Sequence, residues 1–160
     1  MKDVAQHLRE TIDAVLPLLK SIKDADASLK PRPEKWSNKE IIGHLIDSAC
    51  NNQQKFVRTM AQTHLDFVGY KQDEWVALQK YNNADWSKLL DIWVAYNHQI
   101  AHIIENVTPS VLAHTLSIEG VGPFTLQFIM TDYAEHLKHH LRQVLPDAGL
   151  TSTFGNVYNA

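Results

Sequence analysis

Apolar side chains recur every three or four residues over most of this chain, the spacing that places them on one face of an α-helix. Four segments show the pattern: residues 3–22, 38–61, 86–107 and 125–145. Amphipathic helices of this length bury their apolar stripes against one another. The pattern therefore predicts an all-α protein built as a four-helix bundle, with one connection long enough to cross the domain.

Capping and breaking residues set the ends of these helices. Residues 37–40, Ser-Asn-Lys-Glu, form a capping box for the second helix, and Trp36 precedes the cap and is placed to pack on the first turn. Residues 82–85 offer caps for the third helix, and Pro146 stops the last one. Pro17 lies inside the first segment, where it is expected to kink or divide the helix.

The connections predict short extra helix or turn segments between helices two and three and between helices three and four. A loop is expected around residues 67–70, followed by a short helical segment near residues 73–79. Residues 111–116 fit a short turn or strand, and residues 120–123, Gly-Val-Gly-Pro, break regular structure. Pro123 suits the first turn of the last helix. No long alternating pattern predicts a sheet.

Composition narrows the class of protein. The chain has 160 residues, which suits one domain: a bundle over residues 1–146 and a polar tail over residues 147–160, an arm or a partly disordered segment. A net charge of −3 gives no electrostatic footprint for nucleic acid, and no window approaches the roughly 18 apolar residues of a membrane span. A single cysteine, Cys50, fits a reducing compartment. We expect a cytoplasmic protein that acts on small molecules, without nucleic-acid or membrane partners.

Two of the nine histidines have the spacing of a metal-binding pair. His136 and His140 are four residues apart on the last helix, so they stack one turn above the other. His140 falls at the edge of the apolar stripe and His136 slightly outside it, while His139 points towards the polar side. Two imidazoles at this spacing can bind one metal ion from a single helix, although solvated or hydrogen-bonded helix histidines have the same spacing.

A third ligand would have to come from another helix of the bundle. The second helix carries His44 on a polar face, and the third carries His98 and His102, again four residues apart. His7 lies on the first helix. Helical spacing alone leaves open which of these histidines, if any, faces the pair.

Several motifs together point to a known family. They are Lys35-Trp36-Ser37 with Glu40, Gly43-His44-Leu45, Asp47-Ser48, Tyr70 with Asp73-Glu74-Trp75, Gly122-Pro123-Phe124-Thr125-Leu126 and Tyr133-Ala134-Glu135-His136 with His139-His140. With these motifs the chain resembles the DinB/YfiT-like superfamily of bacterial four-helix proteins over nearly its whole length.

The resemblance implies a metal site. In that family one histidine of the second helix and an H-x3-H pair of the last helix hold a divalent ion, zinc or nickel, and the matching positions here are His44, His136 and His140. The chain departs from the family pattern at Glu135, where a Trp often stands, and at Gln143, where many members carry another histidine.

Three imidazoles with an open position are typical of a catalytic metal site. Metal held there can acidify a bound water or bind a substrate thiol as the thiolate. The resemblance therefore implies a thiol S-transferase using a low-molecular-weight thiol of the bacillithiol or mycothiol type, with a metal-dependent hydrolase as the alternative. Two further hypotheses are that the protein is a non-catalytic stress-response binding module, or that the metal has a purely structural role.

Two acids and one surface complete the expectations. Asp132 lies one turn before His136 and Asp47 nearly one turn after His44, so either could orient an imidazole or act as a base, or else be an ordinary solvent-facing acid. Dimers are common in the family that this chain resembles, and exposed apolar residues such as Phe67 and Val68 predict a homodimer surface here.

Overall fold

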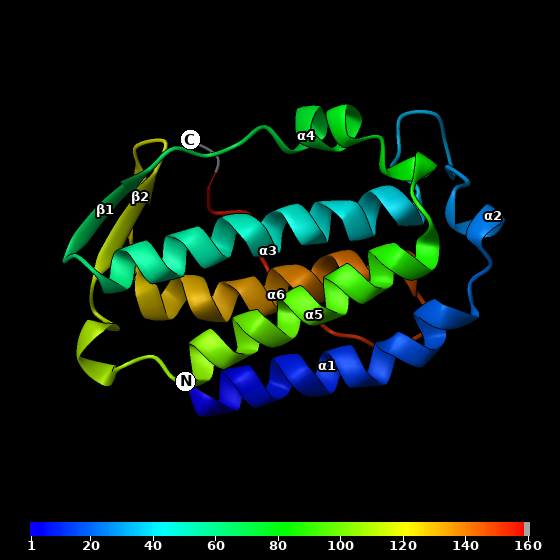
Figure 1. The fold of residues 1–160 in the computed structure, drawn as a ribbon. Coiled ribbons are helices and arrows are strands. Elements are labelled where there is room, and N and C mark those ends of the chain that lie inside the picture. The colour runs from blue at the N-terminus through cyan, green and yellow to red at the C-terminus, as the bar shows by residue number, and fades with distance from the viewer. Residues whose placement is uncertain (159–160) are drawn as a thin grey trace.

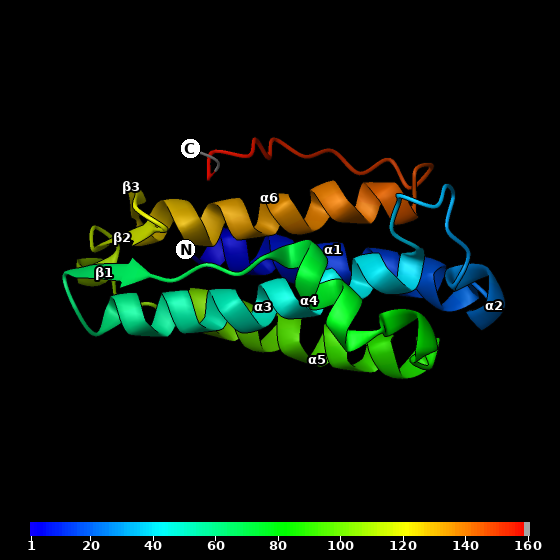
Figure 2. The ribbon, with the colours of Figure 1, turned by 90° about the horizontal axis from the view of Figure 1, so that it is seen from above.

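A computed structural model describes residues 1–158 and confirms the predicted bundle (Figure 1). Its four long helices are α1 (Lys2–Ser21), α3 (Asn38–Met60), α5 (Trp86–Glu105) and α6 (Leu126–Val144). Helices α3 and α5 run in one direction and α1 and α6 in the other, so the chain between α3 and α5 returns along the whole bundle (Figures 1 and 2). That returning segment contains α4 (Gln72–Gln79) and a 3₁₀ turn, η1 (Tyr81–Asn83).

A small sheet closes one end of the bundle. The sequence indicated only a short turn or strand over residues 111–116, and the start of one strand falls there. The strands of the sheet are β1 (His64–Phe67), β2 (Thr115–Ile118) and β3 (Val121–Thr125), in the order β1-β2-β3. Strands β1 and β2 are parallel, whereas β2 and β3 form an antiparallel hairpin. A second 3₁₀ turn, η2 (Pro109–Val111), leads from α5 into this sheet.

The segment over residues 120–123, predicted only to break regular structure, forms part of a β-hairpin. Glu119 and Gly120 both have positive φ, 50° and 80°, which is the backbone of the two-residue turn that favours a twisted hairpin. Pro123 consequently lies in β3 instead of the first turn of α6, and the expectation for Pro123 was wrong. Thr125 caps α6, because its side chain accepts a hydrogen bond from the backbone N–H of Phe128.

Helix boundaries follow the sequence signals closely. The capping box of α3 is present: the Glu40 N–H donates to Ser37 Oγ at 3.2 Å, and the Ser37 N–H donates to Glu40 Oε2 at 2.8 Å. Pro17 does not divide α1, which continues to Ser21. The carbonyl that loses its partner there belongs to Asp13, and it lies on the exposed side of the helix where water can bind it.

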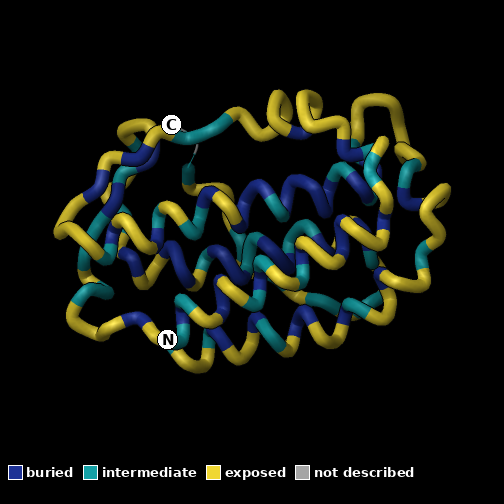
Figure 3. The backbone as a smooth tube through the Cα atoms, viewed as in Figure 1, coloured by how far each residue is buried: buried dark blue, intermediate teal, exposed yellow. Residues whose placement is uncertain are grey.

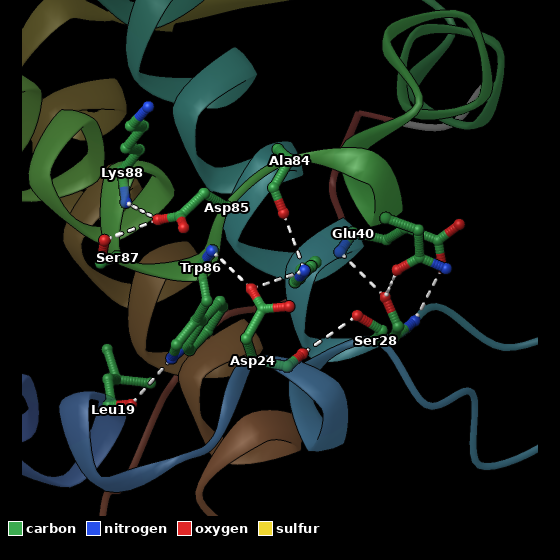
Figure 4. Close-up of polar contacts among 12 residues, drawn as sticks. Leu19, Asp24, Ser28, Glu40, Ala84, Asp85, Trp86, Ser87 and Lys88 are labelled. Atoms are coloured by element: carbon green, nitrogen blue, oxygen red, sulfur yellow. Dashed lines mark hydrogen bonds and ion pairs between the residues drawn. The ribbon is translucent and has the colours of Figure 1, made fainter.

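Asp24 ties together the beginnings of α3 and α5 (Figure 4). It opens the short helix α2 (Asp24–Ala27), and its Oδ1 accepts hydrogen bonds from Lys39 Nζ at 2.8 Å and from the Trp86 N–H at 2.9 Å. These contacts hold the pKa of the Asp24 carboxyl below its usual value. Trp86 also donates through its indole N–H to the Leu19 carbonyl. The first turn of α3 is therefore fixed from outside the helix.

Burial follows the inward faces of the four helices, while the outer faces and α4 are largely exposed (Figure 3). The tail does not extend away as an arm: residues 147–158 return along α6 (Figure 2), and residues 159–160 of the predicted tail lie outside the described part. Phe67 is only 8% exposed, so it cannot belong to the predicted apolar surface, whereas Val68 is 81% exposed. Across residues 1–158, no helix has the length and apolarity to cross a bilayer.

Candidate metal centre

Three histidines from two helices converge between α3 and α6. Each of His44, His136 and His140 offers a ring nitrogen, and these nitrogens all lie within 4.8 Å of one another. His44 Nε2 is 3.4 Å from His136 Nε2. His44 is 1% exposed, so it is a buried residue and not the polar-face residue that helical spacing suggested. The structure thus brings together the three positions that the family resemblance indicated.

The geometry and charge state of this group fit a divalent cation. Zinc–imidazole bonds of about 2.1 Å in a tetrahedron separate neighbouring nitrogens by about 3.4 Å, which matches the observed separation of the two Nε2 atoms. Burial lowers the pKa of His44 to about 4 and that of His140 to about 3, and it lowers the pKa of His136 well below its usual value. Neutral imidazoles are the form that binds metal.

Neighbouring side chains orient two of the three rings. Ser48 Oγ lies 3.5 Å from His136 Nδ1, and Gln143 Nε2 lies 3.4 Å from His140 Nδ1. For His136, the nitrogen opposite this contact is the one that faces His44. Gln143, one of the two departures from the family pattern, therefore supports a histidine of the group. His44 Nδ1 is buried and has no hydrogen-bond partner among residues 1–158.

Aromatic rings enclose the group from both sides. The Trp36 ring lies 5.0 Å from His44 and 6.4 Å from His140, measured between ring centroids. From the tail, the Phe154 ring lies 5.0 Å from His136. Trp36 was predicted to pack on the first turn of α3; its ring lies against His44 and forms a wall of the histidine site. These rings form apolar walls on two sides of the histidines.

Glu135, the second position at which the chain departs from the family pattern, holds the tail in place. The Thr153 N–H donates to Glu135 Oε2 at 2.8 Å, and Ser152 Oγ donates to the Glu135 carbonyl at 2.7 Å. Lys138 Nζ lies 2.5 Å from Glu135 Oε1, which fixes the carboxylate from the other side. Glu135 thus anchors a segment of chain over the site.

The histidines open into a cavity of about 1020 Å³. Its walls come from one face of α3, from α6, from the segment that carries α4 and from the tail. A volume of this size is at the upper end of the range that holds drug-sized ligands, about 300–1000 Å³. The centre therefore lies beside a space that can accept an organic molecule.

The two acids proposed from the sequence have different surroundings. Asp132 lines the cavity, and its Oδ2 accepts a hydrogen bond from the Tyr158 hydroxyl. Asp47 is not among the lining residues; it is buried on α3, where Oδ1 accepts hydrogen bonds from Gln79 at 2.8 Å and from the Tyr81 hydroxyl at 2.7 Å. Burial raises the pKa of both carboxyls. Of the two, only Asp132 is placed to meet a ligand.

The remaining candidate histidines lie elsewhere. His98 and His102 do not join the histidine group, and His102 is an exposed residue whose carbonyl accepts a hydrogen bond from Asn106. His7 is exposed, and its Nε2 lies 3.1 Å from Lys138 Nζ. His139 lines the same cavity but is outside the group of three.

Sequence reasoning missed most of the cavity wall. Ser48, Asn52 and Lys55 continue from His44 along α3 at spacings of four, four and three residues, and all line the cavity. That helical spacing was a usable signal. Tyr158 had no such signal, because it lies in the tail and reaches the cavity only through tertiary structure.

The fold and the site define a four-helix-bundle protein with a three-histidine centre, of the kind that metal-binding bundles build from facing helices. The chain belongs to the DinB superfamily, whose family model matches residues 7–144.

Similar proteins cover nearly the whole chain. One from Bacillus mycoides (strain KBAB4), named "Putative metal-dependent hydrolase", is 23% identical over 149 residues, covering 88% of this chain and 83% of that protein. Another with the same description, from Halalkalibacterium halodurans, is 20% identical over 146 residues, covering 89% and 85%. The solved structure of YfiT from Bacillus subtilis, described as "a probable metal-dependent hydrolase with an unusual four-helix bundle topology", is 20% identical and aligns with a TM-score of 0.81 over 91% of this chain and 84% of its own. This structural match shows the shared fold.

Proposed function

We propose that the protein is a metal-dependent enzyme that holds a divalent cation, zinc or nickel, through His44, His136 and His140 and acts on a small molecule in the adjoining cavity. The observation that carries this proposal is the convergence of three neutral imidazoles at a cavity of about 1020 Å³. The names of the two curated relatives support an enzyme that depends on metal.

The residues around the centre have distinct roles in this proposal. When bound, the cation supplies Lewis acidity, which lowers the pKa of a nucleophile at the open position. Trp36 and Phe154 limit the access of bulk water, while Ser48 and Gln143 orient two of the histidines. Asp132 accepts the proton that the nucleophile loses, because burial raises the pKa of its carboxyl and makes it a stronger base than an exposed aspartate.

The size of the cavity favours thiol S-transfer as the reaction. Such a reaction needs room for a low-molecular-weight thiol, of the bacillithiol or mycothiol type, and for the electrophile that receives its sulfur. A cavity at the upper end of the range for one drug-sized ligand offers that room. The thiol loses its proton, its sulfur forms a bond to the electrophilic carbon, and the leaving group departs with the electron pair.

Hydrolysis is the second candidate, and the names of the relatives favour it. The same centre and the same acceptor, Asp132, serve a water nucleophile as well as a thiol. Hydrolysis requires only one organic substrate, so it would leave part of the cavity without a required occupant.

A direct comparison of the two reactions tests the proposal. Protein loaded with zinc or with nickel is incubated with a panel of small thiols and a fluorogenic alkyl halide, and separately with nitrophenyl esters. We expect thiol adducts to form, to require metal and to be lost in His136→Ala with the fold retained by circular dichroism. Metal-dependent ester cleavage without adducts would select hydrolysis. Full metal binding with neither activity would contradict an enzyme of either kind and favour a binding module.

A further inference from the structure

The cavity wall on α3 is a polar stripe with a positive charge at its far end. His44, Ser48, Asn52 and Lys55 all line the cavity, and their spacing places them on one face of the helix. At a rise of 1.5 Å per residue, the eleven positions from His44 to Lys55 span about 16 Å along the helix axis. Lys55 therefore lines the same cavity as the histidines about three turns along α3 from His44, and its charge still acts on the ring of His136.

Lys55 lies over the ring of Phe67 and has no hydrogen-bond acceptor among residues 1–158. Its Nζ lies 5.4 Å from the centroid of the buried Phe67 ring, and no side-chain or backbone oxygen in the described part of the chain accepts a hydrogen bond from it. Asp132 is near enough to favour the charged form of Lys55, but Asp132 is bonded to the Tyr158 hydroxyl. Burial lowers the pKa of Lys55 to about 8, so the amine is still mostly charged at neutral pH.

The other charged groups on the cavity wall are mostly engaged by protein. Lys71 pairs with Glu74 at 2.9 Å, and both side chains are largely exposed at the rim. Glu119 accepts a hydrogen bond from the Gly69 N–H at 2.7 Å. Asp73 is exposed. A partly buried ammonium without a hydrogen-bond acceptor is costly unless an anion accepts its protons, which makes Lys55 a recognition group for the ligand.

We propose that Lys55 binds a carboxylate on the ligand whose reacting group lies at the histidines, so that the enzyme selects molecules that carry a negative charge apart from the reacting group. This inference rests on the proposed function and names the class of molecule that it takes. A carboxylate fits better than a dianionic phosphate, because the nearby carboxylate of Asp132 repels a second negative charge. The carboxylate belongs either to the nucleophile or to its acceptor.

A pair of probes that differ only at the remote end tests this assignment. Nickel-loaded protein is titrated with 6-mercaptohexanoic acid and with 6-mercaptohexanol, and the sulfur-to-nickel charge-transfer band reports binding of each thiol. In the wild type we expect the acid to bind about tenfold more tightly than the alcohol, the effect of about 1.4 kcal/mol from one charge-assisted hydrogen bond. Lys55→Met should abolish the preference and Lys55→Arg should retain it. The control Lys20→Met, an exposed lysine on α1, should behave as the wild type.

A second readout does not depend on binding at the metal. Trace acetylation of the loaded protein, followed by peptide mass spectrometry, compares the labelling of Lys55 with that of Lys20. We expect the acid to protect Lys55 several-fold while the alcohol does not. Equal labelling with and without the acid would overturn the inference, whether or not the thiols coordinate nickel.

The two proposals fail in different ways. Thiol coordination without preference for the acid, and without protection of Lys55, removes the role of Lys55 and leaves the metal-dependent function standing. Protection of Lys55 without any charge-transfer band removes thiol activation and leaves the carboxylate site. In the transfer assay, acidic and neutral forms of thiol and electrophile identify the source: the reactant whose KM rises in Lys55→Met with little change in kcat carries the carboxylate.

Discussion

His139 and His140 are adjacent on α6, yet only His140 belongs to the histidine group. The pair provides a matched test of the metal site. We expect His140→Ala to lose almost all bound zinc or nickel and His139→Ala to retain it, as measured by mass spectrometry of the metal content. At a free metal concentration of 100 times Kd, binding stabilises the native state by about 2.7 kcal/mol, so the wild type and His139→Ala should melt several degrees above His140→Ala.

Equal metal content in the two variants would contradict the assignment of His140. Circular dichroism of metal-free protein is the control, because the three proteins should be equally helical before metal is added. A loss of helix in His140→Ala would call for the milder His140→Gln, which keeps a polar side chain of similar length.

The two acids should separate chemistry from stability. Asp132→Asn is expected to lower kcat by about 10²–10⁴-fold, the usual contribution of a general base, with a small effect on unfolding. Asp47→Ala is expected to lower the free energy of unfolding by about 1–3 kcal/mol, because the buried Tyr81 hydroxyl loses an acceptor, while the activity of the folded protein is retained. Urea denaturation and initial rates measure both effects. An Asp47→Ala variant that is stable but inactive would reverse the two roles.

At the scale of elements, α3 depends on a close contact with η1. A Cβ atom built on Gly43 would lie 2.1 Å from Cδ2 of the buried Tyr81 ring, so only glycine lets this ring pack on the helix and reach Asp47. We expect Gly43→Ala to destabilise the protein by about 1–3 kcal/mol, the usual cost of overpacking, even though alanine favours helices by about 1 kcal/mol. Gly155→Ala, with open space around its Cβ position, is the control. Equal urea midpoints for the two variants would show that Tyr81 moves aside freely.

Asp24 links elements in a way that depends on pH. Its contacts with Lys39 and Trp86 lower its pKa in the folded protein, so their stabilisation is present above the unfolded pKa of about 3.9 and is lost as the pH falls through the lower folded value. Asp24→Asn should therefore lower the melting temperature at pH 7, and the difference from the wild type should shrink towards pH 3. The side chain is largely exposed, so the effect should also weaken in high salt. Asp26→Asn, in the same turn, is the control; a pH-independent difference for Asp24→Asn would contradict the argument.

At the scale of the whole molecule, the bundle was predictable because long apolar stripes specify helices locally. The ends of α3 and α6 fell within a residue or two of their signals, and the capping box of Ser37 and Glu40 is present. The sheet was not predictable, because β1 and β3 are only four and five residues long and their burial does not produce a long alternating pattern. Strand β1 also pairs with a strand about fifty positions later in the chain, as in the pairing of Leu65 with Leu116.

The site shows the same division between local and tertiary information. Spacing indicated His136 and His140, and the family resemblance added His44. The burial of His44 and the different surroundings of Asp47 and Asp132 depend on which helix faces meet, which spacing on one helix does not fix. The tail shows the largest discrepancy: its polar sequence suggested an arm, but Glu135 and Asp132 hold it across the cavity.

That covering segment leads to a prediction about access to the centre. Phe154 packs on His136 and His139, with ring centroids 5.0 and 5.4 Å apart, and the tail is fixed on either side of it by Glu135 and Tyr158. Removing the ring in Phe154→Ala should open the wall without releasing the tail. We expect metal to pass to a coloured chelator several-fold faster than from the wild type, with the melting temperature of metal-free protein little changed, because the ring contacts the site more than the core.

Val157→Ala is the matched control, since Val157 belongs to the same tail and is an exposed residue. Its metal release should match the wild type. Equal release rates for Phe154→Ala and Val157→Ala would show that the tail does not limit access, and entry would then have to be sought on the Trp36 side of the histidines. A faster rate in Phe154→Ala alone would mean that the last residues of the chain, which the helical pattern does not specify, determine how the centre exchanges with solvent.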